Sequence, residues 1–323
     1  MPRVSVVLPV FNGAATIGQA LSSLSDQTFG DFEIVVVDDG SNDDTPQFLQ
    51  RHVESDARIV VIRTPNRGLV EALNTGLDAA QGEFVARMDA DDICHPERLA
   101  KQVAYLDRTP KAVVVGSQVL VIDAQGVPVP RQPSLGSHKM KDRCKGFSYF
   151  PLAPPTVAHP SAMIRRSSLE EVGRYRRFFA MGSEDRDLWW RLMSVGEIHR
   201  IPERLVRYRV HGGNLTAVKR RDILVAALIA DLSAVARHFG RGDESLLGDL
   251  TSDSGVEILK RYAALLDDCY PVRALVFHRA IRSKVPEFAS WIERPEMRRE
   301  IARHLLRKRN ASGQWRLLQA AML

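Results

Sequence analysis

Cysteine is scarce in this sequence, and no two cysteines stand in a metal-binding spacing. The 323 residues include three, Cys94, Cys144 and Cys269. An odd number so widely separated argues against both a disulfide framework and a zinc knuckle. We therefore expect reduced thiols and a cytoplasmic protein.

Long apolar runs are also lacking. The longest stretch, Ile223 to Ala236, is interrupted by Asp231 and falls short of the ~20 residues that a membrane-spanning helix needs. The first residues, Met1 to Arg3, lead straight into an apolar segment without the charged leader and cleavage site of a secretory signal. We expect any membrane contact to be peripheral.

The glycine-rich loops of common nucleotide-binding proteins are missing as well. No Gly-x-Gly-x-x-Gly follows the first apolar segment, Val4 to Val10, and no loop ends in Gly-Lys-Ser or Gly-Lys-Thr. A bound diphosphate would then have to be held through a metal ion rather than by a helix N-terminus.

Net charge is +6, and the basic residues gather near the end of the sequence. Arginine and lysine are frequent from Arg294 onward. They form either a solvated helical face or an amphipathic surface helix that touches anionic lipid, with Trp315 and nearby leucines as its apolar side. Because they are not interleaved with aromatic residues in a groove-like pattern, we expect no nucleic-acid partner.

Short apolar segments alternate with helical patterns in the first half of the chain. The expected strands are Val4–Val10, Glu33–Val37, Arg58–Ile62 and Phe84–Met88. The expected helices cover Ile17–Leu24, a segment opened by Thr45 as N-cap, and Leu69–Ala80 with Gly82 as C-cap. This alternation predicts an α/β fold, a mostly parallel sheet with helices on both faces.

The later part of the chain changes character. We expect an antiparallel strand over Val113–Ile122, a helix from Glu184 and a strand over Leu205–Val210. Beyond Thr216 only helical patterns occur, including one from Ile223 to Phe239. We therefore predict an α/β domain over residues 1–216 and a helical region over residues 217–323.

Polar residues follow three of the expected strands. The segments are Phe11-Asn12-Gly13, Asp38-Asp39-Gly40-Ser41 and Asp89-Ala90-Asp91-Asp92. Ligands of open α/β sheets bind beyond the carboxyl ends of the strands, and so many carboxylates on one rim repel one another unless a cation lies among them. Mg²⁺ or Mn²⁺ would suit these oxygens and leave room for a phosphate. The alternative is that these residues form ordinary solvated turns.

In their order and spacing these segments resemble glycosyltransferase family 2. The matching pieces are Val4–Asn12, Val37–Ser41, Asn66–Gly68 with Ala72–Gly76, Arg87–Asp92, Glu184–Trp189 and Tyr208–His211, so the resemblance covers roughly residues 3–216. It implies the GT-A fold and an inverting transfer of a sugar from a nucleotide-sugar donor to a hydroxyl of a glycan or lipid-linked acceptor.

The resemblance also implies where the donor and metal bind. Asp39 would accept from the uracil imide of a UDP-sugar, and Asp38 would order that loop. Asp89 and Asp91 would form the Asp-x-Asp motif for Mn²⁺ or Mg²⁺, with Asp91 the direct ligand, and His211 would approach from the far side. The other donor-binding positions would be Pro9, Val10, Phe11, Asn12, Asn66, Arg67 and Ala90.

Asp185 would be the general base. Ser183 is a suitable N-cap, which places Asp185 in the first turn of a helix, where the dipole favours the ionised form. The alternative is that this acid only stabilises the helix end. Trp189 and Trp190 could stack on a sugar, although an adjacent pair usually has at least one ring in the core.

Two other functions share these features. A sugar nucleotidyltransferase would use a similar sheet and metal, but it usually carries a basic, glycine-rich loop after the first strand, and Phe11–Ala15 contains no basic residue. A non-catalytic nucleotide or glycan binder would need a decayed site, whereas Asp39, Asp89, Asp91 and Asp185 are all present. Neither the donor sugar nor the oligomeric state follows from the sequence.

Overall fold

The computed structural model describes residues 1–130, 143–144, 157–180, 182–214, 220–238, 242–244 and 247. The chain divides into two compact units, one of residues 1–148 with 155–220 and one of residues 149–154 with 221–323. The helical pattern predicted around Ile258 and the basic segment from Arg294 lie outside the described residues, as does most of the predicted region 217–323.

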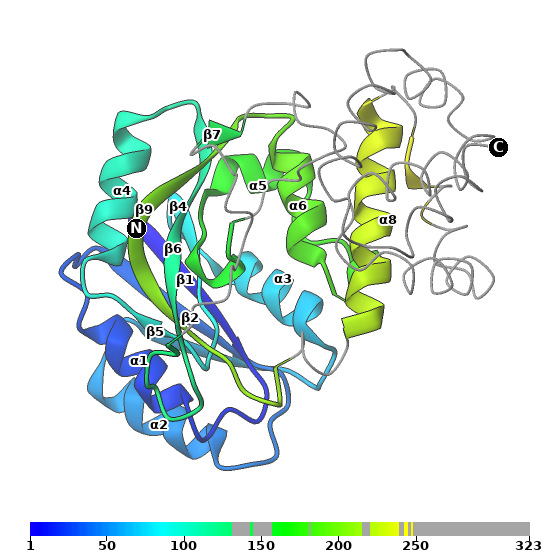
Figure 1. Cartoon of the computed structure of the whole chain (residues 1–323). Coiled ribbons are helices and arrows are strands. Elements are labelled where there is room, and N and C mark those ends of the chain that lie inside the picture. Colours follow the sequence, from blue (N-terminus) through cyan, green and yellow to red (C-terminus); the bar gives the residue numbers. More distant parts are fainter. Residues whose placement is uncertain are drawn as a thin grey trace. The chain divides into compact units, whose positions relative to one another are not determined.

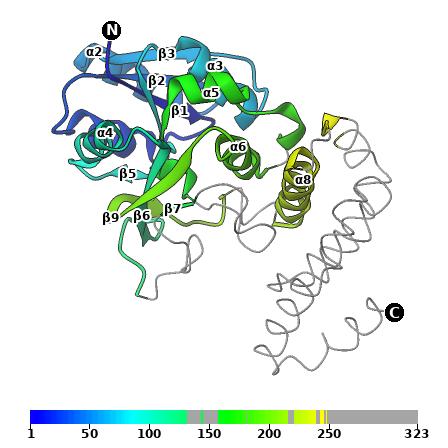
Figure 2. The ribbon, with the colours of Figure 1, turned by 90° about the horizontal axis from the view of Figure 1, so that it is seen from above.

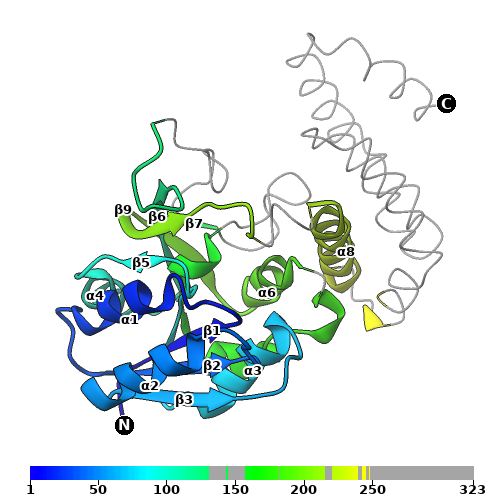
Figure 3. The same cartoon turned by 90° about the horizontal axis from the view of Figure 1, so that it is seen from below.

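The first unit is built on a nine-stranded sheet with the order β3-β2-β1-β4-β8-β6-β9-β5, and β7 pairs with β9 (Figure 1). The strands of the parallel part are β1 (Val4–Val10), β2 (Phe32–Asp38), β3 (Ile59–Arg63) and β4 (Phe84–Arg87). Figures 2 and 3 show the progression from β3 at one edge through β2 and β1 towards β6 and β9.

The rest of the sheet is mixed. It contains β5 (Ile93–Cys94), β6 (Ala112–Ile122), β7 (Arg143–Cys144), β8 (Met163–Arg165) and β9 (Glu197–Arg209). Strand β8 runs antiparallel to both β4 and β6. It follows that β6 points the same way as β4, so the antiparallel direction expected for Val113–Ile122 is wrong, and the reversal occurs at β8.

Helices cover both faces of the sheet. Their bounds are α1 (Ile17–Ser25), α2 (Thr45–Ser55), α3 (Leu69–Ala79), α4 (Arg98–Arg108), α5 (Arg166–Val172) and α6 (Glu184–Leu192), with 3-10 turns η2 (His159–Ser161) and η3 (Arg177–Phe179).

One core joins alternate residues of β1, such as Val6 and Leu8, to α1, α2 and α4, and a second joins Val35 and Val37 of β2 to α3 (Figure 1). Helix α3 lies close to the sheet at Gly76, where an added Cβ would meet Cγ1 of Val7 at 2.5 Å. The predicted α/β class with helices on both faces is confirmed.

Two predicted helix caps are wrong. Helix α2 begins at Thr45 itself, with Asp44 as its N-cap, because the Thr45 hydroxyl instead accepts the backbone N–H of Gly13 at 2.8 Å. Helix α3 is capped by Ala80 rather than Gly82. Gly82 instead lies against β1, and a Cβ there would meet the Ser5 nitrogen at 2.5 Å.

Apart from its first residue, Arg220, helix α8 (Arg220–His238) belongs to the second unit, and it agrees with the helical pattern predicted from Ile223. Near its end, Arg237 pairs with Asp243, which also accepts a hydrogen bond from Ser233. Within the described residues, no helix is both long and apolar enough to cross a bilayer.

Candidate active site

The loops after β1 and β2 are joined to each other by side-chain hydrogen bonds. Asp38 is buried, and its carboxylate accepts the Ser41 N–H at 2.9 Å. The Ser41 hydroxyl in turn accepts the N–H of Asn12, and the Asn12 side chain accepts the N–H of Asn42. Asp38 thus orders the loops at the carboxyl ends of β1 and β2, an edge of the sheet that we call the rim. The exposed side chain of Phe11 belongs to the same loops.

Asp39 connects this rim to a third loop. Its two carboxylate oxygens accept the backbone N–H groups of Arg67 and Gly68 at 2.9 and 2.8 Å, and the Thr64 hydroxyl lies 3.3 Å away. The residue is only 4% exposed. The carboxylate therefore fixes the turn that leads into α3. Because a carboxylate has roughly four acceptor positions and these donors occupy most of them, Asp39 has little capacity left to accept hydrogen bonds from a ligand.

Glycine is required at position 40 between these loops. Its φ of +77° lies in the left-handed region, and an added Cβ would meet the Asn66 nitrogen at 2.7 Å. Backbone of the Asp38–Ser41 loop can approach Asn66 only because residue 40 has no side chain.

Directly after β4, three carboxylates converge. Asp89, Asp91 and Asp92 each offer an oxygen, and these oxygens all lie within 4.8 Å of one another. The sequence predicted Asp89 and Asp91 in this place and did not assign Asp92. The three acids follow β4, whose neighbour in the sheet is β1, so they stand at the same carboxyl-end rim as the loops around Asp38 and Asn12.

Residues from the end of β9 hold this acidic cluster. The Nε2 of His211 lies 3.0 Å from Oδ2 of Asp91, and the Asn214 amide lies 3.3 Å from the same oxygen. Arg209 donates its backbone N–H to Asp92 and its Nε to the Asp91 carbonyl, both at 2.8 Å. Arg87, buried in β4, pairs with Asp89.

The cluster carries strong mutual repulsion. Burial, followed by the charges of Asp89 and Asp91, raises the pKa of Asp92 well above its usual range. Burial and Asp89 also raise the pKa of Asp91, against the opposing hydrogen bond from His211. Burial and the three acids together raise the pKa of Tyr208 to about 12, so its phenol remains protonated beside them.

These residues fit a divalent cation. The Oδ2 of Asp92 is buried and has no hydrogen-bond partner among the described residues, and a cation supplies the charge that such an acceptor lacks. Carboxylate oxygens and one imidazole are ligands that Mn²⁺ and Mg²⁺ accept. The three residues predicted to bind the metal, Asp89, Asp91 and His211, lie next to one another in the structure.

Asp185 lies in the first turn of α6, as predicted. It is half-buried, and its Oδ1 accepts the Arg186 N–H at 2.7 Å. Burial and the charge of Glu184 raise the pKa of Asp185, while His159 and Arg186 oppose the shift. Ser183 occupies the N-cap position but makes no side-chain capping bond.

Tyr175 is buried near charged residues of two segments, the first turn of α6 and strand β4. The phenol is buried, and its pKa is far above the usual range because burial and the charges of Glu184 and Asp185 outweigh the opposing Arg87. Arg87 is the partner of Asp89. Tyr175 thus lies within electrostatic range of Glu184, of Asp185 and of the Arg87 that pairs with Asp89.

The tryptophans after Asp185 do not offer a stacking surface. Trp189 and Trp190 are 1% and 2% exposed, so both rings belong to the core. Asp187 is also fully buried and pairs with Arg191 at 2.9 Å.

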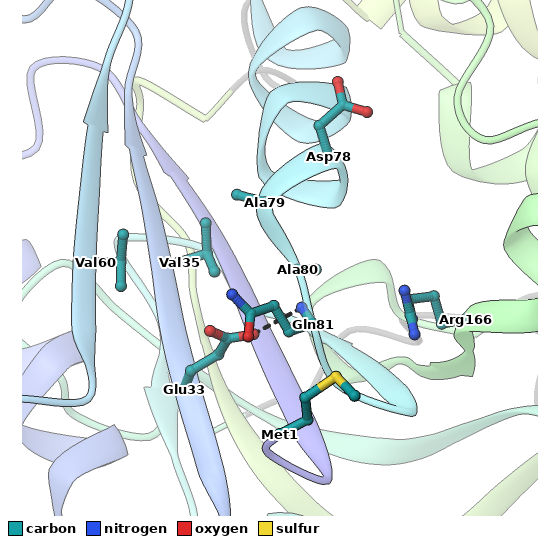
Figure 4. Close-up of a pocket in the computed structure, with 9 residues that line it drawn as sticks. All are labelled: Met1, Glu33, Val35, Val60, Asp78, Ala79, Ala80, Gln81 and Arg166. Carbon is teal, nitrogen blue, oxygen red and sulfur yellow. Dashed lines mark hydrogen bonds between the residues drawn. The ribbon is translucent and has the colours of Figure 1, made fainter.

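A separate hollow of about 490 Å³ lies away from this rim. It is lined by Glu33 and Val35 of β2, Val60 of β3, the end of α3, Met1 and Arg166 (Figure 4). Glu33 accepts the N–H of Gln81 there. Because Glu33 stands near the amino end of β2, this hollow is at the opposite end of the sheet, and no predicted site residue lines it.

Comparisons with known proteins agree with this arrangement. A sequence model described as Glycosyl transferase family 2 matches residues 5–173. An uncharacterized glycosyltransferase of Haemophilus influenzae is 30% identical over 232 residues, 68% of this chain and 69% of the relative. The amylovoran biosynthesis glycosyltransferase AmsE of Erwinia amylovora is 31% identical over 221 residues, 67% of this chain and 79% of the relative.

Solved structures share the fold. S. aureus TarS 1–349 in complex with UDP-GlcNAc gives a TM-score of 0.59 at 20% identity and covers 89% of both chains. The mannosyltransferase PcManGT from Pyrobaculum calidifontis, in complex with GDP-Man and Mn2+, gives 0.55 at 20% identity, over 94% of this chain and 86% of that one.

Proposed function

The chain belongs to glycosyl transferase family 2, and from that premise we propose that it inverts the anomeric centre while moving a sugar from a UDP-sugar to an acceptor hydroxyl. The observation that carries this proposal is the acidic cluster of Asp89, Asp91 and Asp92 on the rim that also bears Asp38 and Asp39. We assign residues 1–216 to the catalytic domain and residues 217–323 to a helical region.

The nucleotide would bind over the loops after β1, β2 and β3. Phe11 is exposed enough to pack on the base, next to Pro9, Val10 and Asn12. Asp39 already accepts two backbone N–H groups, so a contact with the uracil imide would use its remaining acceptor capacity. Asn66 and Arg67 would lie beside the nucleotide, because both are exposed on the turn that Asp39 fixes.

Mn²⁺ or Mg²⁺ would be held by Asp91, with Asp89, Asp92 and His211 close by, and when bound it would stabilise negative charge on the departing diphosphate. Asp89, paired with Arg87, and the adjoining Ala90 would stand nearer the ribose. His211 would have to give up its Nε2 proton to become a ligand, because Nδ1 now accepts the Gly213 N–H at 3.2 Å.

Asp185 would take the proton of the attacking hydroxyl. General-base catalysis of this kind typically contributes ~10²–10⁴-fold, and a raised pKa brings a carboxylate nearer the pH at which such a base works well. The hydroxyl oxygen would form a bond to the anomeric carbon as the bond to the diphosphate oxygen breaks, and the proton would remain on Asp185.

The acceptor is a glycan or a lipid-linked sugar in our proposal. The TarS structure holds UDP-GlcNAc, which favours a UDP-sugar donor. AmsE is named for amylovoran biosynthesis, which favours a biosynthetic role, and we place this chain in the making of a polysaccharide or glycolipid. Peripheral attachment of a cytoplasmic protein through the basic residues after Arg294 would bring the site to lipid-linked acceptors.

The test is a donor screen. The protein is incubated with Mn²⁺ and a panel of UDP-, GDP- and dTDP-sugars, and release of nucleoside diphosphate is followed. Release of UDP supports the proposal, and GDP or dTDP release would correct the base. Pyrophosphate release would instead identify a nucleotidyltransferase, and binding without turnover for any acceptor would identify a non-catalytic binder.

A further inference from the structure

His159 lies against the helical turn that carries Glu184 and Asp185. Its ring is 8% exposed. Nε2 lies 2.7 Å from the Tyr175 hydroxyl, and Nδ1 lies 3.5 Å from Oε1 of Glu184. The ring also meets Trp189 edge-on, with centroids 5.9 Å apart and an interplanar angle of 86°. Three neighbours therefore fix the ring.

These neighbours determine which ring nitrogen carries a proton. A phenol can donate or accept, whereas an ionised carboxylate can only accept. A lone pair on Nδ1 would face a carboxylate oxygen of Glu184 at 3.5 Å, which favours the tautomer with the proton on Nδ1. In the neutral ring Tyr175 then donates to Nε2, and in the charged ring it accepts.

Glu184 needs this partner. It is 7% exposed and lies in the first turn of α6, and a buried carboxylate is unfavourable unless it is paired or hydrogen-bonded. Without the His159 N–H, the Glu184 side chain would turn towards solvent. Asp185 is the next residue of the same turn, so its side chain would shift with it.

The other side of His159 is anchored to the sheet. The backbone of Tyr175 is bonded at both of its polar groups to the Asn74 side chain, at 2.9 and 3.2 Å. Asn74 belongs to α3, which packs on β1 and β2. A continuous path thus runs from α3 through Tyr175 and His159 to Glu184.

We propose that His159 is a positioning residue for sugar transfer, which presents its Nδ1–H to Glu184 and so fixes the first turn of α6 with Asp185 aimed at the acceptor hydroxyl. This inference rests on the proposed role of Asp185 as the base. In this proposal His159 acts through Glu184 rather than through contact with donor or acceptor.

Two matched substitutions test the role of the Nδ1 donor. The amide of His159→Asn stands near the place of Nδ1 and keeps a donor for Glu184, whereas the amide of His159→Gln reaches the place of Nε2 and loses it. The assay is UDP release from UDP-N-acetylglucosamine with Mn²⁺, where water replaces the acceptor, and UDP affinity is measured by titration.

We expect His159→Gln to lower kcat by ~100-fold, the effect of misplacing a reacting group by about 1 Å, with unchanged UDP affinity and KM. His159→Asn should retain most of kcat. The inference is overturned if His159→Gln keeps wild-type kcat, if both variants fall equally, or if UDP affinity falls along with kcat, which would indicate a general structural role.

A spectroscopic measurement tests the arrangement without turnover. In ¹⁵N-histidine spectra, the His159 signals are identified by their loss in His159→Gln. We expect a protonated Nδ1 whose resonance shifts in Glu184→Gln. A neutral ring protonated at Nε2 overturns the inference even if UDP is released. The converse result is also informative. If Nδ1 is protonated but the protein releases no nucleoside diphosphate from any donor, the proposed function is contradicted, while the arrangement of His159 and Glu184 is supported.

Discussion

His211 and Asp91, 120 positions apart in the sequence, meet at the rim of the sheet with Nε2 and Oδ2 separated by 3.0 Å. Because Gly213 donates its N–H to Nδ1 of the same ring, His211 is the donor and Asp91 the acceptor. The segment after β9 therefore lies against the Asp89–Asp92 segment that follows β4.

Replacing His211 by alanine should weaken metal binding. The change removes both a candidate ligand and the hydrogen bond that orients Asp91, and loss of an outer partner typically lowers metal affinity by about 10–100-fold. Mn²⁺ affinity can be measured by electron paramagnetic resonance of free Mn²⁺. Asn214→Ala removes the 3.3 Å contact to Asp91 and the bonds of the same side chain to the His211 N–H and the Arg209 carbonyl, but no candidate metal ligand. Its effect should therefore be smaller, and an equal effect of both variants would argue against direct ligation by His211.

Asp39→Asn should destabilise the protein as well as weaken nucleotide binding. An asparagine would turn an NH₂ group towards one of the backbone N–H groups of Arg67 and Gly68, leaving a buried donor unsatisfied, at a loss of about 1–3 kcal/mol. Urea denaturation measures this loss. Asp44→Asn is the matched control, because Asp44 is exposed and makes no side-chain capping bond. Equal stabilities would contradict the role we give Asp39.

Glu184→Gln should move the acid limb of the pH–rate profile to lower pH. Asp185 is active as a base only when ionised, so the rate falls as the pH drops through its pKa, which burial and Glu184 raise above the ordinary value of ~3.9. Removing the charge of Glu184 lowers that pKa, while His159 and Arg186 remain and favour the ionised form. The measurement is kcat/KM against pH for wild type and variant, and a limb that stays fixed or moves upward would argue against Asp185 as the base.

The parallel half of the sheet could be predicted because its strands are continuous apolar runs. All seven residues of β1 are buried, and such a run between turn residues has few other interpretations. The early part of β9 was not expected, because Glu197–Arg204 includes several charged residues and Pro202. It is a strand because β6 pairs with it along its length and β7 and β5 pair with parts of it.

The acidic cluster was only partly visible in the sequence. The segment Asp89–Asp92 marked the place, but the Arg209 N–H that fixes Asp92 comes from 117 positions away, and no local pattern encodes such a pairing. The same holds for Asn214 and for the contact between His159 and Glu184. Arg87 is one residue from which a contact could have been predicted. A charged side chain in an apolar strand needs an oppositely charged partner, and Asp89 is that partner.

The most direct test of the account is a Mn²⁺ titration in the presence of UDP, followed by electron paramagnetic resonance, on wild type, Asp91→Asn and Asp107→Asn. Asp107 is a surface acid that pairs with Arg3, so its variant controls for the loss of one charge. We predict that wild type and Asp107→Asn bind one Mn²⁺ together with UDP and that Asp91→Asn does not. Unchanged Mn²⁺ binding by Asp91→Asn, or none by wild type, would contradict a metal-assisted transfer at this rim.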